Sequence, residues 1–178
     1  VNKPYKYFLN NVVGTLNLLE IMVKNNCKKI IFSSSASVYG NPEYVPIDEN
    51  HPKNPINPYG KSKLMVEQIL EDFDKAYGLK YIVFRYFNAA GHDFDGELKE
   101  RHDPETHLLP LIIKTVTGGS KAVEVFGTDY DTKDGSCVRD FIHVEDLCNA
   151  HLKGLELFFD LNKKVVSDHF NLGNANGF

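Results

Sequence analysis

Short apolar strands alternate with amphipathic helices along the first half of the sequence, and this order constrains the fold more than any other feature. Apolar residues recur at steps of three and four from Phe8 to Val23, which predicts a helix through about the first 25 residues. Strands are predicted at Lys28–Ser34 and Lys80–Tyr86, with a helix from about Pro58 to Ala76 between them. Helices and strands at this spacing indicate parallel βαβ units, so we expect an α/β fold with a doubly wound parallel sheet.

The character of the sequence changes near residue 89. Residues 91–107 are rich in His, Asp and Glu and show no periodicity. The elements predicted beyond them are strands at Val123–Phe126 and His169–Leu172 and helices at Leu108–Val116 and Val144–Phe159. We therefore expect residues 1–88 to be the second half of a dinucleotide-binding domain. Residues 89–178 should form part of a smaller substrate-binding region, with some elements returning to the first domain.

No Gly-x-x-Gly-x-x-Gly or Gly-x-Gly-x-x-Gly loop occurs in the sequence. A doubly wound dinucleotide-binding domain carries such a loop at its first strand-to-helix turn. The sequence also opens inside a predicted helix and stops after Gly177-Phe178. We therefore expect an internal piece of a larger protein, truncated at both ends.

Composition and charge exclude several classes of function. The formal net charge is -4 and no basic run is present, so we expect no nucleic-acid partner. The apolar stretches are too short to span a bilayer, so we expect no membrane insertion. Cys27, Cys137 and Cys148 form no Cys-x-x-Cys pair. They predict small, buried, reduced thiols in a cytoplasmic protein.

The strongest chemical pattern is Tyr59-Gly-Lys-Ser-Lys63, at the start of the second predicted helix. Positions i and i+4 share one face of a helix, so Tyr59 and Lys63 are expected to point into one site. A phenol is a poor base at neutral pH unless a neighbouring cation stabilises the phenolate. Beside Lys63, Tyr59 is expected to remove a hydroxyl proton as hydride leaves the same carbon. Taken alone the pattern is weak, because an exposed helix start with a solvated lysine looks the same.

A serine-rich run, Ser33-Ser-Ser-Ala-Ser-Val-Tyr-Gly40, directly follows the first predicted strand. Ligands of open α/β sheets bind outside the carboxyl ends of the strands, where hydroxyls can donate to a substrate oxygen. In isolation, a turn with local backbone bonds explains such a run. The proline-rich residues 41–58 predict a long surface loop between this run and Tyr59. The serine run, the loop and the Tyr-x-x-x-Lys pattern follow one another in this order. Together they predict that the serines, Tyr59 and Lys63 belong to one ligand-binding site.

Several long blocks resemble UDP-glucose 4-epimerases of the extended short-chain dehydrogenase/reductase family. The serine run and Pro58-Tyr-Gly-Lys-Ser-Lys-Leu-Met-Val-Glu-Gln68 resemble the catalytic segments, and further blocks match at 85–91, 106–110 and 134–144. The resemblance covers nearly the whole chain. It implies a Rossmann-type fold, bound NAD, a UDP-sugar substrate and a homodimer. The implied reaction is reversible epimerisation at C4 of UDP-glucose and UDP-galactose through a 4-keto sugar.

The resemblance also implies residue roles. Tyr59 resembles the catalytic base, and Lys63 resembles the lysine that holds the nicotinamide ribose and stabilises the phenolate. Ser35 matches the serine that contacts the sugar 4-hydroxyl, and Ser37 stands beside it, where the family often has threonine. The other implied cofactor contacts are Asn10, Ser33 and Phe87. The implied contacts to the UDP part of the substrate are Asn88, Leu108, Phe126 and Arg139.

Two of these residues also have a physical argument of their own. A diphosphate needs a fixed cation, and the guanidinium of Arg139 offers bidentate bonds. The competing interpretation is a surface ion pair of Arg139 with Asp140 or Asp146. The ring of Phe126 is able to stack on uracil. Judged without the family resemblance, core packing in a short strand is the better explanation for an aromatic residue at this position.

The alternatives differ in chemistry. A nucleotide-sugar 4,6-dehydratase resembles these enzymes but carries Asp-Glu after the serine strand, where this chain has Ala36-Ser37. A UDP-glucuronate 4-epimerase is a second alternative, and a non-catalytic binding domain is a third for this chain alone. His92, His102 and His107 lie among acidic residues, but their spacing matches no metal motif. We therefore interpret them as part of a solvated loop and expect no metal.

Overall fold

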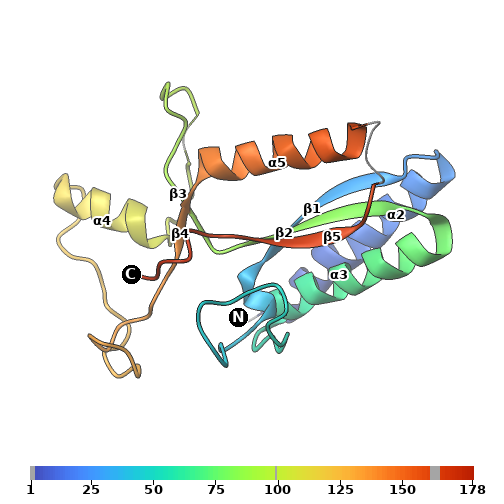
Figure 1. Cartoon of the computed structure of the whole chain (residues 1–178). Helices are drawn as coiled ribbons and strands as arrows, with labels where there is room; N and C mark the ends of the chain where they lie inside the picture. The colour runs from blue at the N-terminus through green and yellow to red at the C-terminus, as the bar shows by residue number, and fades with distance from the viewer. Residues whose placement is uncertain (1–2, 99, 161–164) are drawn as a thin grey trace.

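The main sheet has three parallel strands in the order β1-β2-β5 (Figure 1). The computed structural model describes residues 3–98, 100–160 and 165–178. Strand β1 is Lys29–Ser35, β2 is Lys80–Tyr86 and β5 is Asp168–Leu172. Ser35 lies opposite Tyr86, and Tyr86 lies opposite Leu172. The three strands therefore end at one edge of the sheet, and all three match strands expected from the sequence.

Helices cover both faces of this sheet (Figure 1). Helices α2 (Gly14–Lys24) and α3 (Pro58–Tyr77) lie on one face, and α5 (Val144–Phe159) lies on the other. Between the sheet and α2 and α3 is a buried cluster of Leu19, Val66, Leu70, Leu79, Tyr81 and Val83. Each fully buried leucine contributes about 1.5–3 kcal/mol to folding. The two-sided arrangement confirms the doubly wound α/β fold.

The first helix predicted from the sequence is continuous in the structure but not uniform. It runs from α1 (Pro4–Tyr7) through a π-helical segment, η1 (Phe8–Val13), into α2. The side-chain amide of Asn11, in η1, donates to the hydroxyl of Ser62 on α3 at 2.9 Å. This bond attaches the N-terminal helical run to the helix that carries Tyr59 and Lys63.

Local sequence signals explain where α3 begins and ends. The side chain of Asn57 accepts a hydrogen bond from the amide of Gly60 at 2.8 Å, and Pro58 occupies the first turn, where no donor is needed. Gly78 ends the helix with a φ of 67°, a left-handed conformation that glycine adopts without strain. The predicted helix is confirmed, one residue longer than expected at its C-terminal end.

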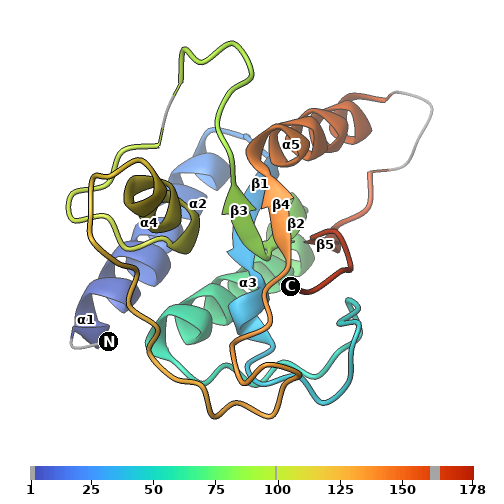
Figure 2. The same ribbon diagram turned by 90° about the vertical axis from the view of Figure 1, so that its left-hand side faces the viewer.

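Beyond the carboxyl ends of the main strands lies a smaller layer, in which a two-stranded parallel sheet stands beside a helix (Figure 2). Strands β3 (Asn88–Ala90) and β4 (Phe141–His143) form the sheet, and α4 (Leu108–Val116) is the helix. Helices α4 and α5 match the predicted bounds. The two strands were not predicted, because three residues are too short for a periodic signal.

The predicted strand at Val123–Phe126 is wrong. The structure assigns these residues no regular form, and Phe126 is 90% exposed. A strand needs a neighbouring strand to take its backbone hydrogen bonds. Among the described residues no segment pairs with 123–126. The domain division at residue 88 remains a prediction, although β5 from the second predicted region does pair with β2 of the first.

The cysteines are free thiols, as expected, but the prediction that they are buried is wrong. Cys27 and Cys148 are exposed, and Cys137 is half-buried. Cys27 lies in the turn after α2, and Cys148 lies on a solvent-facing position of α5. In the part of the chain that the structure describes, no helix is long and apolar enough to cross a membrane.

Candidate functional site

Tyr59 and Lys63 lie one helical turn apart on α3, as the sequence predicts. The ammonium of Lys63 lies 5.6 Å from the centre of the Tyr59 ring and 4.9 Å from the centre of the Phe32 ring. It donates a 2.8 Å hydrogen bond to the backbone carbonyl of Ser33 in β1. The structure therefore brings Tyr59, Lys63 and Ser33 together at the end of the first strand.

A glycine allows α3 to come this close to β1. A Cβ atom at Gly60 would collide with the backbone carbonyl of Ser37 and lie 3.0 Å from the Cβ of Pro55. Ser37 belongs to a single 3₁₀ turn, η2 (Ala36–Val38), that directly follows β1 and packs against α3. The absence of a side chain at Gly60 thus keeps Tyr59 near the serine run.

The serine hydroxyls at the end of β1 are linked to one another and to the next strand. The Ser35 hydroxyl oxygen accepts from the Ser37 hydroxyl at 3.0 Å and from the Ser37 amide at 3.2 Å. The Ser33 and Tyr86 hydroxyls share a 2.9 Å hydrogen bond. The Tyr86 hydroxyl also bonds the Nε2 atom of His151 on α5, at 2.8 Å. These bonds hold the hydroxyl groups in place at the end of β1.

Lys63 is half-buried, and this burial lowers the pKa of its ammonium group. Desolvation disfavours the charged form, whereas the Ser33 carbonyl and the faces of two aromatic rings give the cation partial compensation. An ammonium group carries three N–H donors, and the Ser33 carbonyl takes one of them. Donors therefore remain for a ligand with hydroxyl oxygens.

A pocket lies between Tyr59 and the helical run at the N-terminus of the chain. Its lining is formed by Lys3, Lys6, Tyr7, Asn10, Asn11 and Tyr59. The rings of Tyr7 and Tyr59 meet edge to face, with their centres 6.0 Å apart. Asn10, expected from the sequence to contact the cofactor, thus lies in a pocket shared with Tyr59.

Sequence reasoning missed a buried charged network behind the site. Arg85 on β2 and Glu67 on α3 are each about 1% exposed. Two guanidinium nitrogens of Arg85 donate to the Glu67 carboxylate at 2.8 and 3.1 Å, and a third bond reaches the Tyr39 hydroxyl at 2.8 Å. The Ser34 hydroxyl also donates to Glu67, at 2.6 Å. An arginine inside an apolar strand, Lys-Tyr-Ile-Val-Phe-Arg-Tyr, was the available signal.

The remaining predicted residues lie in the smaller layer or lead into it. Phe87 follows β2, and its amide donates to the Leu172 carbonyl at 3.1 Å. The side chain of Asn88 donates to the Asp140 carbonyl at 2.9 Å and so links β3 to the segment before β4. Leu108 is the first residue of α4 and is exposed. The structure thus places Asn88 and Leu108 beyond the strand ends.

Arg139 and Phe126 are displayed to solvent rather than packed. The Arg139 guanidinium donates to the backbone carbonyl of Val138 at 3.0 Å, and the Arg139 backbone pairs in both directions with Phe178. Among the described residues, no ion pair joins Arg139 to Asp140 or Asp146. The carboxylate of Asp140 instead accepts from the amides of Asn174 and Ala175. The surface pair considered from the sequence is therefore not formed, and the core packing considered for Phe126 is wrong.

Comparison with known proteins decides the family. The sequence pattern of the NAD dependent epimerase/dehydratase family matches residues 1–173. The chain belongs to this family.

Individual members of the family agree with this assignment. The chain is 51% identical to the UDP-glucose 4-epimerase of Lactobacillus helveticus, over all of this chain and 53% of that protein. The structure of the Brucella ovis UDP-glucose 4-epimerase in complex with NAD matches with a TM-score of 0.93 and 47% identity, over 100% of this chain and 54% of that one. The Bifidobacterium longum UDP-glucose 4-epimerase in complex with NAD⁺ and UDP matches with a TM-score of 0.91 and 44% identity, over 100% and 53%. The chain spans about half the length of the curated relatives it matches.

Proposed function

We propose that the intact protein interconverts UDP-glucose and UDP-galactose by NAD-dependent epimerisation at C4. The observation that carries the proposal is the position of Lys63, whose ammonium bonds the Ser33 carbonyl at the end of β1 and lies 5.6 Å from the centre of the Tyr59 ring. The names of relatives at 45–51% identity support the same substrate class. A cytoplasmic location and a homodimer remain predictions.

The residues present fit the nicotinamide end of NAD. Lys63 has donors left for ribose hydroxyls, and Asn10 lines the pocket beside Tyr59. Ser33 and Phe87 lie at the carboxyl ends of β1 and β2, where ligands of this fold class bind. Bound there, NAD would supply a reversible hydride acceptor.

The proton chemistry falls to Tyr59 and the two serines. In the proposed mechanism Tyr59 removes the proton of the sugar 4-hydroxyl, and the nearby Lys63 ammonium stabilises the phenolate. The Ser35 hydroxyl, which accepts the proton of the Ser37 hydroxyl, donates its own proton to the sugar oxygen as the 4-keto group forms. The 4-keto sugar then turns over, and the opposite epimer forms when hydride and proton return.

The UDP end must stay held while the sugar end turns. Asn88, Leu108, Phe126 and Arg139 are proposed as the tether at the UDP end. Arg139 and Phe126 are exposed, so their side chains are available to a diphosphate and a uracil ring. The side chains of Ser35, Ala36 and Ser37 are small and leave room at the sugar end. Ala36 and Ser37 also offer no carboxyl group for eliminating water, which disfavours a 4,6-dehydratase.

An isotope experiment tests the proposed function. Deuterium placed at C4 of UDP-galactose should remain at C4 in both epimers, because the transferred hydride returns to the carbon it left. NADH in solution should not exceed one equivalent per site. Mass spectrometry and NMR of the products provide the measurement. Loss of the label to solvent, or a stable oxidised sugar with stoichiometric NADH, would overturn the epimerase assignment.

A further inference from the structure

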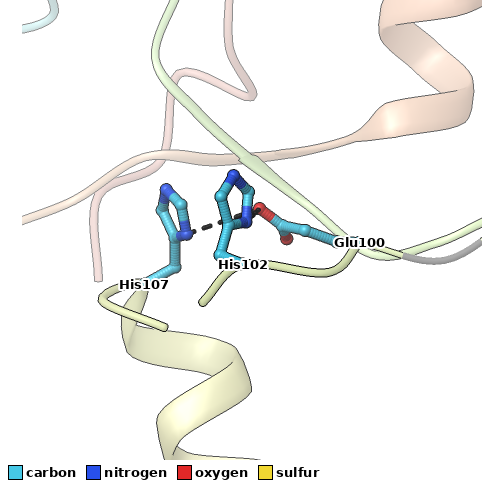
Figure 3. Close-up of side chains that lie close together, drawn as sticks. All are labelled: Glu100, His102 and His107. Atoms are coloured by element: carbon cyan, nitrogen blue, oxygen red, sulfur yellow. Dashed lines mark ion pairs between the residues drawn. The ribbon is translucent and has the colours of Figure 1, made fainter. Parts of the chain in front are cut away.

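Three ligand-type side chains converge just before α4 (Figure 3). The Nδ1 atom of His102 lies 3.1 Å from the Oε1 atom of Glu100, and the Nδ1 atom of His107 lies 3.4 Å from the same oxygen. One potential ligand atom from each residue lies within 4.8 Å of the other two. Two imidazoles and a carboxylate therefore face a common point.

Two of the three separations match those around a tetrahedral metal ion. Zinc binds histidine nitrogen and carboxylate oxygen at about 2.0–2.2 Å, which places neighbouring ligand atoms roughly 3.3 Å apart. The two nitrogen–oxygen distances of 3.1 and 3.4 Å lie on either side of that value. The histidine ligand atoms lie within 4.8 Å of each other, and rotation of these exposed side chains would close the set around a cation.

The surroundings favour a cation over an anion. Residues 100–107 contain three acidic residues and one arginine. A second carboxylate, that of Glu105, lies 2.8 Å from Nδ1 of His107 and 4.0 Å from Nδ1 of His102. All three ligand residues are exposed, so an ion has a path in from solvent.

The same groups also form hydrogen bonds without a metal. The Glu105 carboxylate accepts from Nδ1 of His107 and from the amides of Thr106 and His107 at the start of α4. A metal ion would bind Nδ1 of each neutral imidazole with the ring proton on Nε2, so ion binding competes with the hydrogen bond between Nδ1 of His107 and Glu105. Glu105 keeps its amide bonds in either state and holds the segment in shape.

We propose that Glu100, His102 and His107 bind a borderline divalent cation such as Zn²⁺ through one carboxylate oxygen and two Nδ1 atoms. The sequence spacing matches no metal motif, which is why a solvated loop was expected. The cation joins an irregular segment to the first turn of α4 and restrains the residues that lead into Leu108. Mixed nitrogen and oxygen ligands select Zn²⁺, Co²⁺ or Ni²⁺ over Mg²⁺, which prefers oxygen alone.

The test is a Zn²⁺ titration of the metal-free intact protein against a chromogenic chelator. Exposed thiols also bind zinc, so the titration uses a background in which Cys27, Cys137 and Cys148 are replaced by serine. His102→Ala and Glu100→Gln remove one ligand each. The matched control is His92→Gln, which changes an exposed histidine of the same segment that bonds the carbonyl of Asp93.

The expected result is one bound Zn²⁺ per chain, with affinity at least about tenfold weaker in each ligand variant and within about twofold in the control. Excess Mg²⁺ should not displace the ion. Equal affinity in the background protein and in His102→Ala, or no binding at all, would overturn the proposal. Neither readout depends on epimerase activity.

Discussion

At the residue scale, the proposed chemistry rests on one hydroxyl, that of Tyr59. Tyr59→Phe keeps the ring that meets Tyr7 and removes the group that takes the proton. We expect kcat with UDP-galactose to fall by about 10²–10⁴, the usual contribution of a general acid–base group. UDP affinity should be nearly unchanged. Steady-state kinetics and calorimetry with UDP measure the two quantities, and a kcat within a few-fold of the parent value would remove Tyr59 from the mechanism.

At the element scale, the first turn of α3 is positioned by its contact with η2. Gly60→Ala places a methyl group against the Ser37 carbonyl, so the turn carrying Tyr59 must move away from Ser35. A displacement of about 1 Å can cost on the order of 10²-fold in rate, so we expect kcat to fall by about 10- to 100-fold. Gly78→Ala is the matched control, because Gly78 ends the same helix and no atom of the described residues lies within 4 Å of an added Cβ.

The control substitution should cost about 1 kcal/mol of stability through its left-handed φ while leaving kcat within about twofold. Urea unfolding and steady-state kinetics of both variants separate stability from positioning. An equal loss of kcat in the two variants would mean that α3 stability alone, rather than the contact with Ser37, explains the effect.

At the scale of the whole molecule, a buried polar centre joins the sheet to α3 and makes stability depend on pH. His169 on β5 packs edge to face on Tyr81, and its Nε2 atom is buried with no hydrogen-bond partner among the residues that the structure describes. The nearest carboxylate oxygens, on Glu67 and Glu71, are each 3.9 Å away, too far for a hydrogen bond.

The pKa of His169 is lowered, mainly because the imidazole is buried and further because Arg85 and Lys53 repel its charged form. The carboxylates of Glu67 and Glu71 partly oppose this shift. Since the unfolded chain takes up the proton more readily, the contribution of His169 to stability is complete above its unfolded pKa of about 6.5. It is lost as the pH falls toward the folded value. In urea unfolding, the parent should therefore lose stability relative to His169→Gln between pH 7 and pH 5. A constant difference between the two proteins over this range would show that His169 has the same pKa in the folded and the unfolded chain.

The sequence by itself determined the local elements and the pair at the centre of the site. Periodicity located α3, because this helix buries an apolar stripe that includes Leu70, and the spacing of Tyr59 and Lys63 placed both on one helix face. Tertiary structure alone decided what depends on distant neighbours. The segment 123–126 has strand-forming residues but finds no partner strand among the described residues, whereas β3 and β4 form because their three-residue segments meet.

Arg85 and Glu67 are 18 residues apart and become a buried pair when β2 lies under α3. Glu100, His102 and His107 fit no metal spacing in the sequence, and the turn before α4 brings their ligand atoms together.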